Sequence, residues 1–180
     1  MLHAKKFNAS STNWVGLWTL FNKETVRFLK VFYQTVLAPV VTNILFLTVF
    51  LIVIDRENFV IGGVSYSEFL VPGLIMMQIL QNAFMNTSST IMISKVQGNI
   101  VDILLPPLSN LELTLALSFG GVARGMIVGL ASIVALFFFI DMKFTNFFYI
   151  IFFSLSGSFA LSLLGIMGGI WSEKFDHMAG

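Results

Sequence analysis

The sequence predicts an all-α, polytopic membrane protein that forms a single domain. Its 180 residues are 57% hydrophobic and only 11% charged, which exceeds the apolar content of ordinary soluble domains. Twenty Phe and nine Met residues add bulk without hydrogen-bonding demand. Four apolar runs are each long enough to cross a bilayer core of about 30 Å. We therefore expect an N-terminal interfacial helix, four transmembrane helices and one short helix in a loop.

The segment at about residues 13–35 is expected to form the amphipathic interfacial helix, with Asn13 as its N-cap. Basic residues recur at helical spacing on one face, and aromatic residues occupy the other. A helix of this kind lies in the membrane surface, with its cations at anionic headgroups. The predicted anchoring residues are Trp14, Trp18, Lys23, Arg27 and Lys30. The alternative is that the segment is a charged extension of the first span.

The first two spans differ in polarity. The first, at about residues 36–54, is uncharged and contains Pro39, which marks the expected bend after the surface helix. The second, at about residues 69–93, has an unusually polar inner half. Its amides either line a substrate path or form hydrogen bonds between helices. The candidate path residues are Asn43, Gln78, Asn82 and Asn86.

The loop at residues 95–112, KVQGNIVDILLPPLSNLE, is the longest polar interruption between apolar segments. Apolar residues fall at helical spacing from Val96 to Leu105, which predicts a short amphipathic helix. Pro106 and Pro107 end this helix because neither has an amide hydrogen to donate. Such a helix either presents its polar face to a partner or is an ordinary interfacial segment, and the pattern leaves both interpretations open.

The third span is predicted at about residues 119–140, after a half-submerged lead-in at residues 113–118, and the fourth at about 147–171. We expect Arg124, about one turn inside the third span, to snorkel to headgroups or to pair, with a substrate role as the alternative. Small residues on both spans are expected to let other helices approach closely. They are Gly121, Gly125, Gly129, Gly165 and Gly169.

The basic residues predict the orientation, because cytoplasmic loops carry the excess of Lys and Arg. One side of the predicted topology carries Lys5, Lys6, Lys23, Arg27, Lys30, Lys95 and Lys174, and the other carries only Arg56 and Lys143. We therefore expect the N-terminus and the 95–112 loop to face the cytoplasm, where ATP and soluble partners are found.

The sequence lacks the patterns of several enzyme classes. It contains no GxxxxGK[ST] phosphate loop, no HExxH and no GxSxG, and without Cys it has no thiolate metal site. No Asp, Glu or Lys lies inside a predicted span, which argues against ion-coupled transport. We expect no catalytic residue, no bound metal and no nucleic-acid partner. If the protein moves a substrate uphill, its energy comes from a separate cytoplasmic subunit.

Four segments, ordered along the whole chain, resemble the permease subunit of ABC-2 type transporters. Residues 14–39, with NKETVRFLKVFYQTVLAP as their latter part, are similar to the interfacial helix that leads into the first span of that family. Residues 66–77, YSEFLVPGLIMM, resemble its entry into the second span. Residues 98–112, GNIVDILLPPLSNLE, resemble its cytoplasmic motif, and residues 169–176, GIWSEKFD, the loop after its fourth span.

The resemblance implies a permease dimer with six spans per chain and two cytoplasmic ATPase subunits, which bind the ATP and Mg²⁺. It also implies an inner-membrane exporter of a lipid, polysaccharide or amphiphilic drug. The 95–112 loop would carry the coupling helix that docks on the ATPase. The residues that match the family's coupling motif are Gly98, Asp102, Leu104, Pro107, Ser109 and Glu112. Since the chain ends after four predicted spans, we expect residues 1–180 to be a C-terminally incomplete domain.

A non-transport function is the alternative. A membrane scaffold could use the glycine faces of the third and fourth spans to dimerise, without ever touching an ATPase. The two hypotheses differ in whether an ATPase subunit binds the chain.

Overall fold

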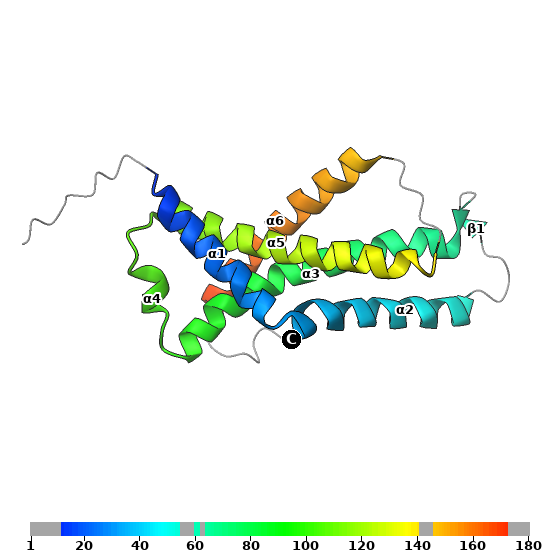
Figure 1. Ribbon diagram of the computed structural model, residues 1–180, viewed down its shortest axis with the longest axis horizontal. Coiled ribbons are helices and arrows are strands. Elements are labelled where there is room, and N and C mark those ends of the chain that lie inside the picture. Colours follow the sequence, from blue (N-terminus) through cyan, green and yellow to red (C-terminus); the bar gives the residue numbers. More distant parts are fainter. Residues whose placement is uncertain (1–11, 55–59, 62–63, 141–145, 173–180) are drawn as a thin grey trace, which may run out of the picture.

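The computed structural model describes residues 12–54, 60–61, 64–140 and 146–172, and these are overwhelmingly helical (Figure 1). The elements in chain order are α1 (Trp14–Lys30), the π-helix η1 (Tyr33–Leu37), α2 (Ala38–Ile54), β1 (Val60–Ile61), β2 (Val64–Ser65), α3 (Tyr66–Val96), α4 (Val101–Leu104), α5 (Asn110–Phe137) and α6 (Phe147–Trp171). The predicted all-α class is confirmed. A two-residue antiparallel ladder between β1 and β2 lies at the end of the molecule opposite α4 (Figure 1).

Within the described residues, four helices are long and apolar enough to cross a membrane. They cover Tyr33–Phe50, Glu68–Val96, Asn110–Phe137 and Phe147–Trp171. The bounds of α6 coincide with those of the fourth predicted span, whereas α3 extends beyond the second at both ends. The helix α5 begins earlier than the third predicted span, since the expected lead-in at residues 113–118 is already part of this helix.

The bend between α1 and α2 precedes the proline that was expected to mark it. α1 ends at Lys30, and the five-residue π-helix η1 follows before α2 begins at Ala38. The hydroxyl of Thr35 donates to the carbonyls of Phe28 and Val31, which stabilises the end of α1. Pro39 is therefore the second residue of the outgoing helix, and α1 and α2 run in clearly different directions (Figure 1).

The three long helices α3, α5 and α6 form the centre of the molecule, and glycines set their spacing. A Cβ on Gly121 would lie 2.8 Å from the carbonyl oxygen of Ala83, and a Cβ on Gly125 would lie 2.7 Å from that of Ile79. These distances leave no room for a side chain, so α5 lies directly against the backbone of α3. Gly129 meets the side chain of Ile79 in the same way.

α6 packs against α3 through glycines as well, on a face next to the one that α5 covers. A Cβ on Gly165 would collide with Thr87 and with the carbonyl of Phe84, and a Cβ on Gly169 would lie 3.0 Å from the carbonyl oxygen of Ser88. All five glycines predicted to mediate helix packing therefore lie against α3 of the same chain.

Two apolar clusters hold the ends of the bundle. The cluster at the α4 end joins α1, α3, α5 and α6 through Leu20, Ile91, Ala116, Leu117 and Ile166. The cluster at the β1 end joins α2, α3 and α5 through Leu47, Val71, Ile75, Ile79 and Leu136. α1 is thus part of the packed structure, crossing the bundle beside α5 (Figure 1).

Some residues used for the orientation argument lie outside the described residues. They are Lys5, Lys6, Arg56, Lys143 and Lys174, together with residues 173–176 of the fourth resembling segment.

Candidate functional site

The loop between α3 and α5 begins with a glycine that ends α3. Gly98 has φ +72°, in the left-handed region that residues with a Cβ rarely adopt. The N–H of Asn99 donates to the carbonyl of Ser94 at 3.0 Å, and that of Gly98 donates to the carbonyl of Lys95 at 3.1 Å. This pair of bonds is a Schellman motif, which satisfies the last carbonyls of the helix and turns the chain.

The prediction of one helix from Val96 to Leu105 is wrong, and Gly98 is the reason. Val96 is the last residue of α3, and after the turn the helix α4 spans only Val101–Leu104. Helical periodicity continued across the glycine in the sequence, but the left-handed backbone there redirects the chain.

α4 is attached to the bundle by one side and open on the other. Ile103 is buried, and Ile100 packs on the apolar cluster at the α4 end. Leu104 is 63% exposed and Leu105 is 73% exposed. We call the outward-facing residues the loop surface: Val101, Asp102, Leu104 and Leu105.

The second half of the loop is fixed by a capping box at the start of α5. The N–H of Ser109 donates to Glu112 Oε2 at 2.7 Å, and the N–H of Glu112 donates to Ser109 Oγ at 3.3 Å. The spacing Ser-x-x-Glu is the usual sequence signature of this motif and could have been recognised as one.

Glu112 also joins α5 to the start of α1. Its second carboxylate oxygen accepts from the backbone N–H of Asn13, which is itself the N-cap of α1. Asn13 Nδ2 donates to the carbonyl of Pro107 at 3.3 Å. Next to this contact, a Cβ on Gly16 would lie 2.7 Å from the side chain of Leu108. The start of α1 and the second half of the loop therefore form one connected unit.

The structure divides the six residues carried over from the coupling motif into two groups. Asp102 and Leu104 lie exposed on the loop surface. Gly98, Ser109 and Glu112 shape the backbone around it, and Pro107 supplies a carbonyl to Asn13. The motif thus combines two outward-facing side chains with four residues that hold the loop in place.

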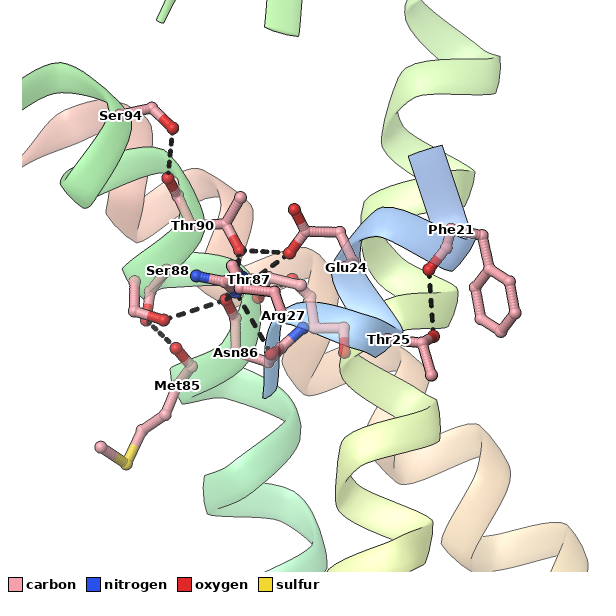
Figure 2. Close-up of polar contacts among 12 residues, drawn as sticks. Phe21, Glu24, Thr25, Arg27, Met85, Asn86, Thr87, Ser88, Thr90 and Ser94 are labelled. Atoms are coloured by element: carbon pink, nitrogen blue, oxygen red, sulfur yellow. Dashed lines mark hydrogen bonds and ion pairs between the residues drawn. The ribbon is translucent and has the colours of Figure 1, made fainter. Parts of the chain in front are cut away.

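A buried polar cluster connects α1 to α3 (Figure 2). Glu24 is only 2% exposed, and Arg27 reaches it across one turn of α1 at 3.0 Å. Thr90 of α3 donates its hydroxyl to Glu24 Oε2 at 2.6 Å. Arg27 Nη2 also donates to the carbonyl of Asn86 at 3.1 Å and to the Thr90 hydroxyl. This cluster links α1 to α3 through an ion pair and shared hydrogen bonds.

These contacts correct the predicted placement of Arg27 on an outward basic face. Arg27 turns towards α3, because the buried carboxylate of Glu24 and the acceptors on α3 lie on that side. Glu24 was overlooked in the sequence, where the i, i+3 pair with Arg27 was the only signal. The other residues predicted to anchor α1 at the membrane are exposed: Trp14, Trp18, Lys23 and Lys30.

Lys95 joins the other end of the loop to α6. Its ammonium donates to the carbonyl of Ile170 and, at 3.1 Å, to that of Ser172. A cation at the last carbonyls of a helix satisfies acceptors that have no partner within the helix. The loop is therefore held from α1, α5 and α6.

The four amides proposed for a substrate path are all buried within the chain. Asn43 Nδ2 donates to Ser132 Oγ at 3.1 Å, which ties α2 to α5. Asn82 Nδ2 donates to the carbonyl of Gln78 at 3.0 Å, and Asn86 accepts from Arg27. These bonds correspond to the interpretation in which the amides serve interhelical and local hydrogen bonding.

An open groove lies along the face of α3 that carries Gln81 and Met85, which is not the face of the buried amides. It has a volume of about 1130 Å³ and is bordered by α3 and by Leu161 of α6. Its polar lining includes Gln81 and Ser89, set among methionines such as Met77 and Met85. In the part of the chain that the structure describes, no three His, Cys, Asp or Glu side chains lie close enough together to hold a metal ion.

Comparison with known proteins places this architecture in a family. Residues 15–180 match the family model described as ABC-2 type transporter. The chain is 31% identical over 166 residues to the inner membrane transport permease YadH of Escherichia coli K12, and to the protein of that name in Shigella flexneri. The match covers 92% of this chain and 65% of the relative's length. No solved structure matches significantly. With a family match over nearly its whole length, the chain belongs to the ABC-2 type transporter family.

Proposed function

We propose that this chain is the membrane-spanning permease subunit of an ATP-driven ABC transporter. It resides in the inner membrane with its N-terminus in the cytoplasm. Family membership supports the permease role, and the similarity to the inner membrane transport permease YadH supports the inner-membrane location. The excess of basic residues on the N-terminal side supports the orientation.

A separate cytoplasmic ATPase docks on the loop surface. This proposal rests on the structure of the loop. One side of the loop packs on the helix bundle, and the other side exposes apolar side chains. Ile103 and Glu112 hold it to the bundle, while Leu104 and Leu105 remain exposed. Exposed leucines grouped on a rigid element, beside a carboxylate, are typical of a protein-binding surface.

The ATPase partner binds the ATP and Mg²⁺, and two ATPase copies act with a second permease copy. When the ATPases close, they push on the loop surface. Because Glu112 and Asn13 join the loop to α1, α1 moves with it. The Arg27 contacts with Asn86 then transmit the shift to α3 as a rigid-body displacement.

The substrate path runs along the groove on α3. Gln81 is an exposed amide midway along a membrane-spanning helix, where an unpartnered polar group is costly if it faces lipid. A groove that combines amide and hydroxyl groups with methionines suits an amphiphilic cargo such as a lipid, a polysaccharide or an amphiphilic drug. Export is the direction that we propose for that cargo.

The scaffold alternative loses its proposed dimerisation surface. It required the glycine faces of the third and fourth spans to receive a second chain. Those faces already receive α3 of the same chain, at Gly125 and Gly169 among others. We therefore prefer the transport function.

The test is ATP hydrolysis by the complex with its ATPase. Asp102→Lys and Leu104→Asp are expected to abolish substrate-stimulated hydrolysis, because they place an opposite or desolvated charge in the interface. Membrane insertion should be unchanged, since neither side chain contacts the bundle.

Asn22→Lys serves as the matched control, since Asn22 is exposed on α1 and lies outside the loop surface. Normal stimulation in both loop variants would refute docking at this surface. Failure of any ATPase to co-purify with the wild-type chain would refute the transporter assignment itself.

A further inference from the structure

Several buried hydrogen-bonding groups at the contact between α1, α3 and α5 have no partner within the described residues. Among the described residues, four buried side-chain atoms have no hydrogen-bond partner: Arg27 Nε, Asn86 Nδ2, Ser118 Oγ and Arg124 Nε. Three of them are N–H donors. Buried donors of this kind are normally satisfied by a protein group, a water molecule or a ligand.

The three donors belong to residues that meet at one place. Arg27 donates to Asn86 through its terminal nitrogen. A Cβ on Gly120 would lie 3.6 Å from Asn86 Nδ2 and 2.9 Å from the Cβ of Glu24, so α5 passes directly over this cluster. Arg124 follows Gly120 by one helical turn on the same face of α5. α1 and α5 run alongside each other here, since Asn13 contacts Glu112 and Glu24 lies under Gly120, so the turn of α5 with Arg124 lies beside the turn of α1 with Arg27.

The same place has an excess of positive charge. Arg27 and Arg124 bring two guanidinium groups, and Glu24 brings one carboxylate. Glu24 is already engaged by Arg27 and Thr90. Within the described part of the chain, no carboxylate contacts Arg124. A guanidinium enclosed in a membrane protein is costly unless an anion accompanies it.

We propose that these three residues, Arg27, Asn86 and Arg124, which we call the arginine cluster, bind a phosphate-type oxyanion carried by the headgroup of an anionic lipid. Guanidinium and amide N–H groups are the donors that phosphate oxygens prefer. The cluster borders the protein surface at Arg27, whose side chain is 33% exposed.

The surroundings of the arginine cluster favour a lipid as the source of the oxyanion. Lys23 and Lys30 are exposed on the same helix as Arg27, and Trp18 is exposed near its start. Lysines and tryptophans of this kind gather at the headgroup layer, so the arginine cluster lies near the depth at which anionic headgroups are concentrated. The sequence led us to expect that Arg124 snorkels or pairs, and its Nε has no acceptor within the described residues.

Thermal unfolding of the 180-residue chain in nanodiscs tests the proposal. Phosphatidylglycerol added to a phosphatidylcholine bilayer should raise the Tm of the wild-type chain. It should raise the Tm of Asn22→Ala equally, since that variant changes an exposed residue of α1 outside the arginine cluster. In Arg124→Gln the rise should be lost, and native mass spectrometry should show phosphatidylglycerol affinity reduced by about tenfold, as loss of one charged hydrogen bond implies.

Inorganic phosphate, added to the chain in neutral detergent, distinguishes the two sources of the oxyanion. A rise in Tm that depends on Arg124 with phosphate alone would support the arginine cluster as an oxyanion site, with a free anion as its ligand. If Arg124→Gln fails to fold, as judged by helical circular dichroism, Arg124→Lys replaces it and should show an intermediate response. An equal response of the Arg124 variant and the wild type, or no response to either probe, would overturn the proposal.

Discussion

Glu24 is the residue on which the docking of α1 depends most directly. Its carboxylate is almost fully buried, and it accepts from a guanidinium on its own helix and from a hydroxyl on α3. A buried carboxylate is stable only when such partners compensate the loss of water. The ion pair therefore acts less as a source of net stability than as a device that fixes which face of α1 turns inward.

Glu24→Gln should lower the stability of the fold. The substitution keeps the shape of the side chain but removes the charge, so Arg27 is left without its counterion. We expect a loss of about 2 kcal/mol, less than for a fully buried pair because Arg27 is one-third exposed. Unfolding in mixed micelles, titrated with SDS, measures this change.

Lys30→Gln is the control for that experiment, since Lys30 is an exposed charge on the same helix. Its effect should stay within about 0.5 kcal/mol. Equal effects of the two variants would show that α1 is not held by the Glu24 contacts.

A second prediction at the level of single residues concerns Gly98. Gly98→Ala should cost about 1–2 kcal/mol, because a Cβ is unfavourable at positive φ. Nothing lies within 4 Å of the added atom, so the cost comes from the backbone alone. Gly98→Asn should be tolerated better, since Asn adopts the left-handed conformation more readily. Hydrogen exchange at residues 94–99 should accelerate in the Ala variant and less in the Asn variant. Equal exchange in both would contradict this account.

At the scale of the elements, the glycine contacts decide how α5 and α6 pack on α3. In α6, a Cβ at Gly165 would overlap the backbone of α3, whereas a Cβ at Gly168 would only touch the ring of Phe84 at 3.6 Å. The two positions lie on one helix and carry the same residue. Alanine substitutions at the two positions therefore separate the effect of close packing from the effect of helix propensity.

Gly165→Ala should destabilise the α3–α6 pair by about 1–3 kcal/mol, as overpacked cores generally do. Gly168→Ala should be neutral or slightly stabilising, because Ala favours the helix more than Gly does. Thermal unfolding of both variants in the same detergent is the measurement. A matching loss at the two positions would argue against the backbone contact.

Sequence patterns predicted the long helices well because apolar length is a local property. The fourth predicted span coincides with α6, and the fold class and family resemblance are confirmed. The loop helix was predicted too long because periodicity does not register a left-handed glycine such as Gly98. Orientation, dimerisation, the ATPase and the roles of the site residues remain predictions.

At the scale of the whole molecule, some contacts could not be predicted from a local sequence pattern, because they join residues that lie far apart in the chain. Asn13 meets Glu112, and Arg27 meets Asn86, across long stretches of sequence. An amphipathic helix with basic residues gives the same pattern whether it rests on lipid or packs on protein. Only the tertiary structure shows that one of its cations turns inward.

Cross-linking can test whether α1 and the loop stay in contact during the transport cycle. The chain has no natural Cys, so within the chain an introduced pair of cysteines can react only with each other. A Gly16→Cys, Leu108→Cys pair replaces two residues whose side-chain positions almost touch. We expect ready oxidative cross-linking, with little effect on substrate-stimulated ATP hydrolysis by the complex. A reversible loss of stimulation on oxidation would show that α1 and the loop must separate during the cycle.

The separation in sequence between the start of α1 and Glu112 imposes an order of events during biosynthesis. Asn13 and its partner are 99 residues apart, so α1 leaves the ribosome long before α5 exists to receive it. In that interval, its lysines and exposed tryptophans allow α1 to bind to the bilayer surface. The same helix therefore serves two successive environments, lipid while the chain is being made and protein once α5 has arrived.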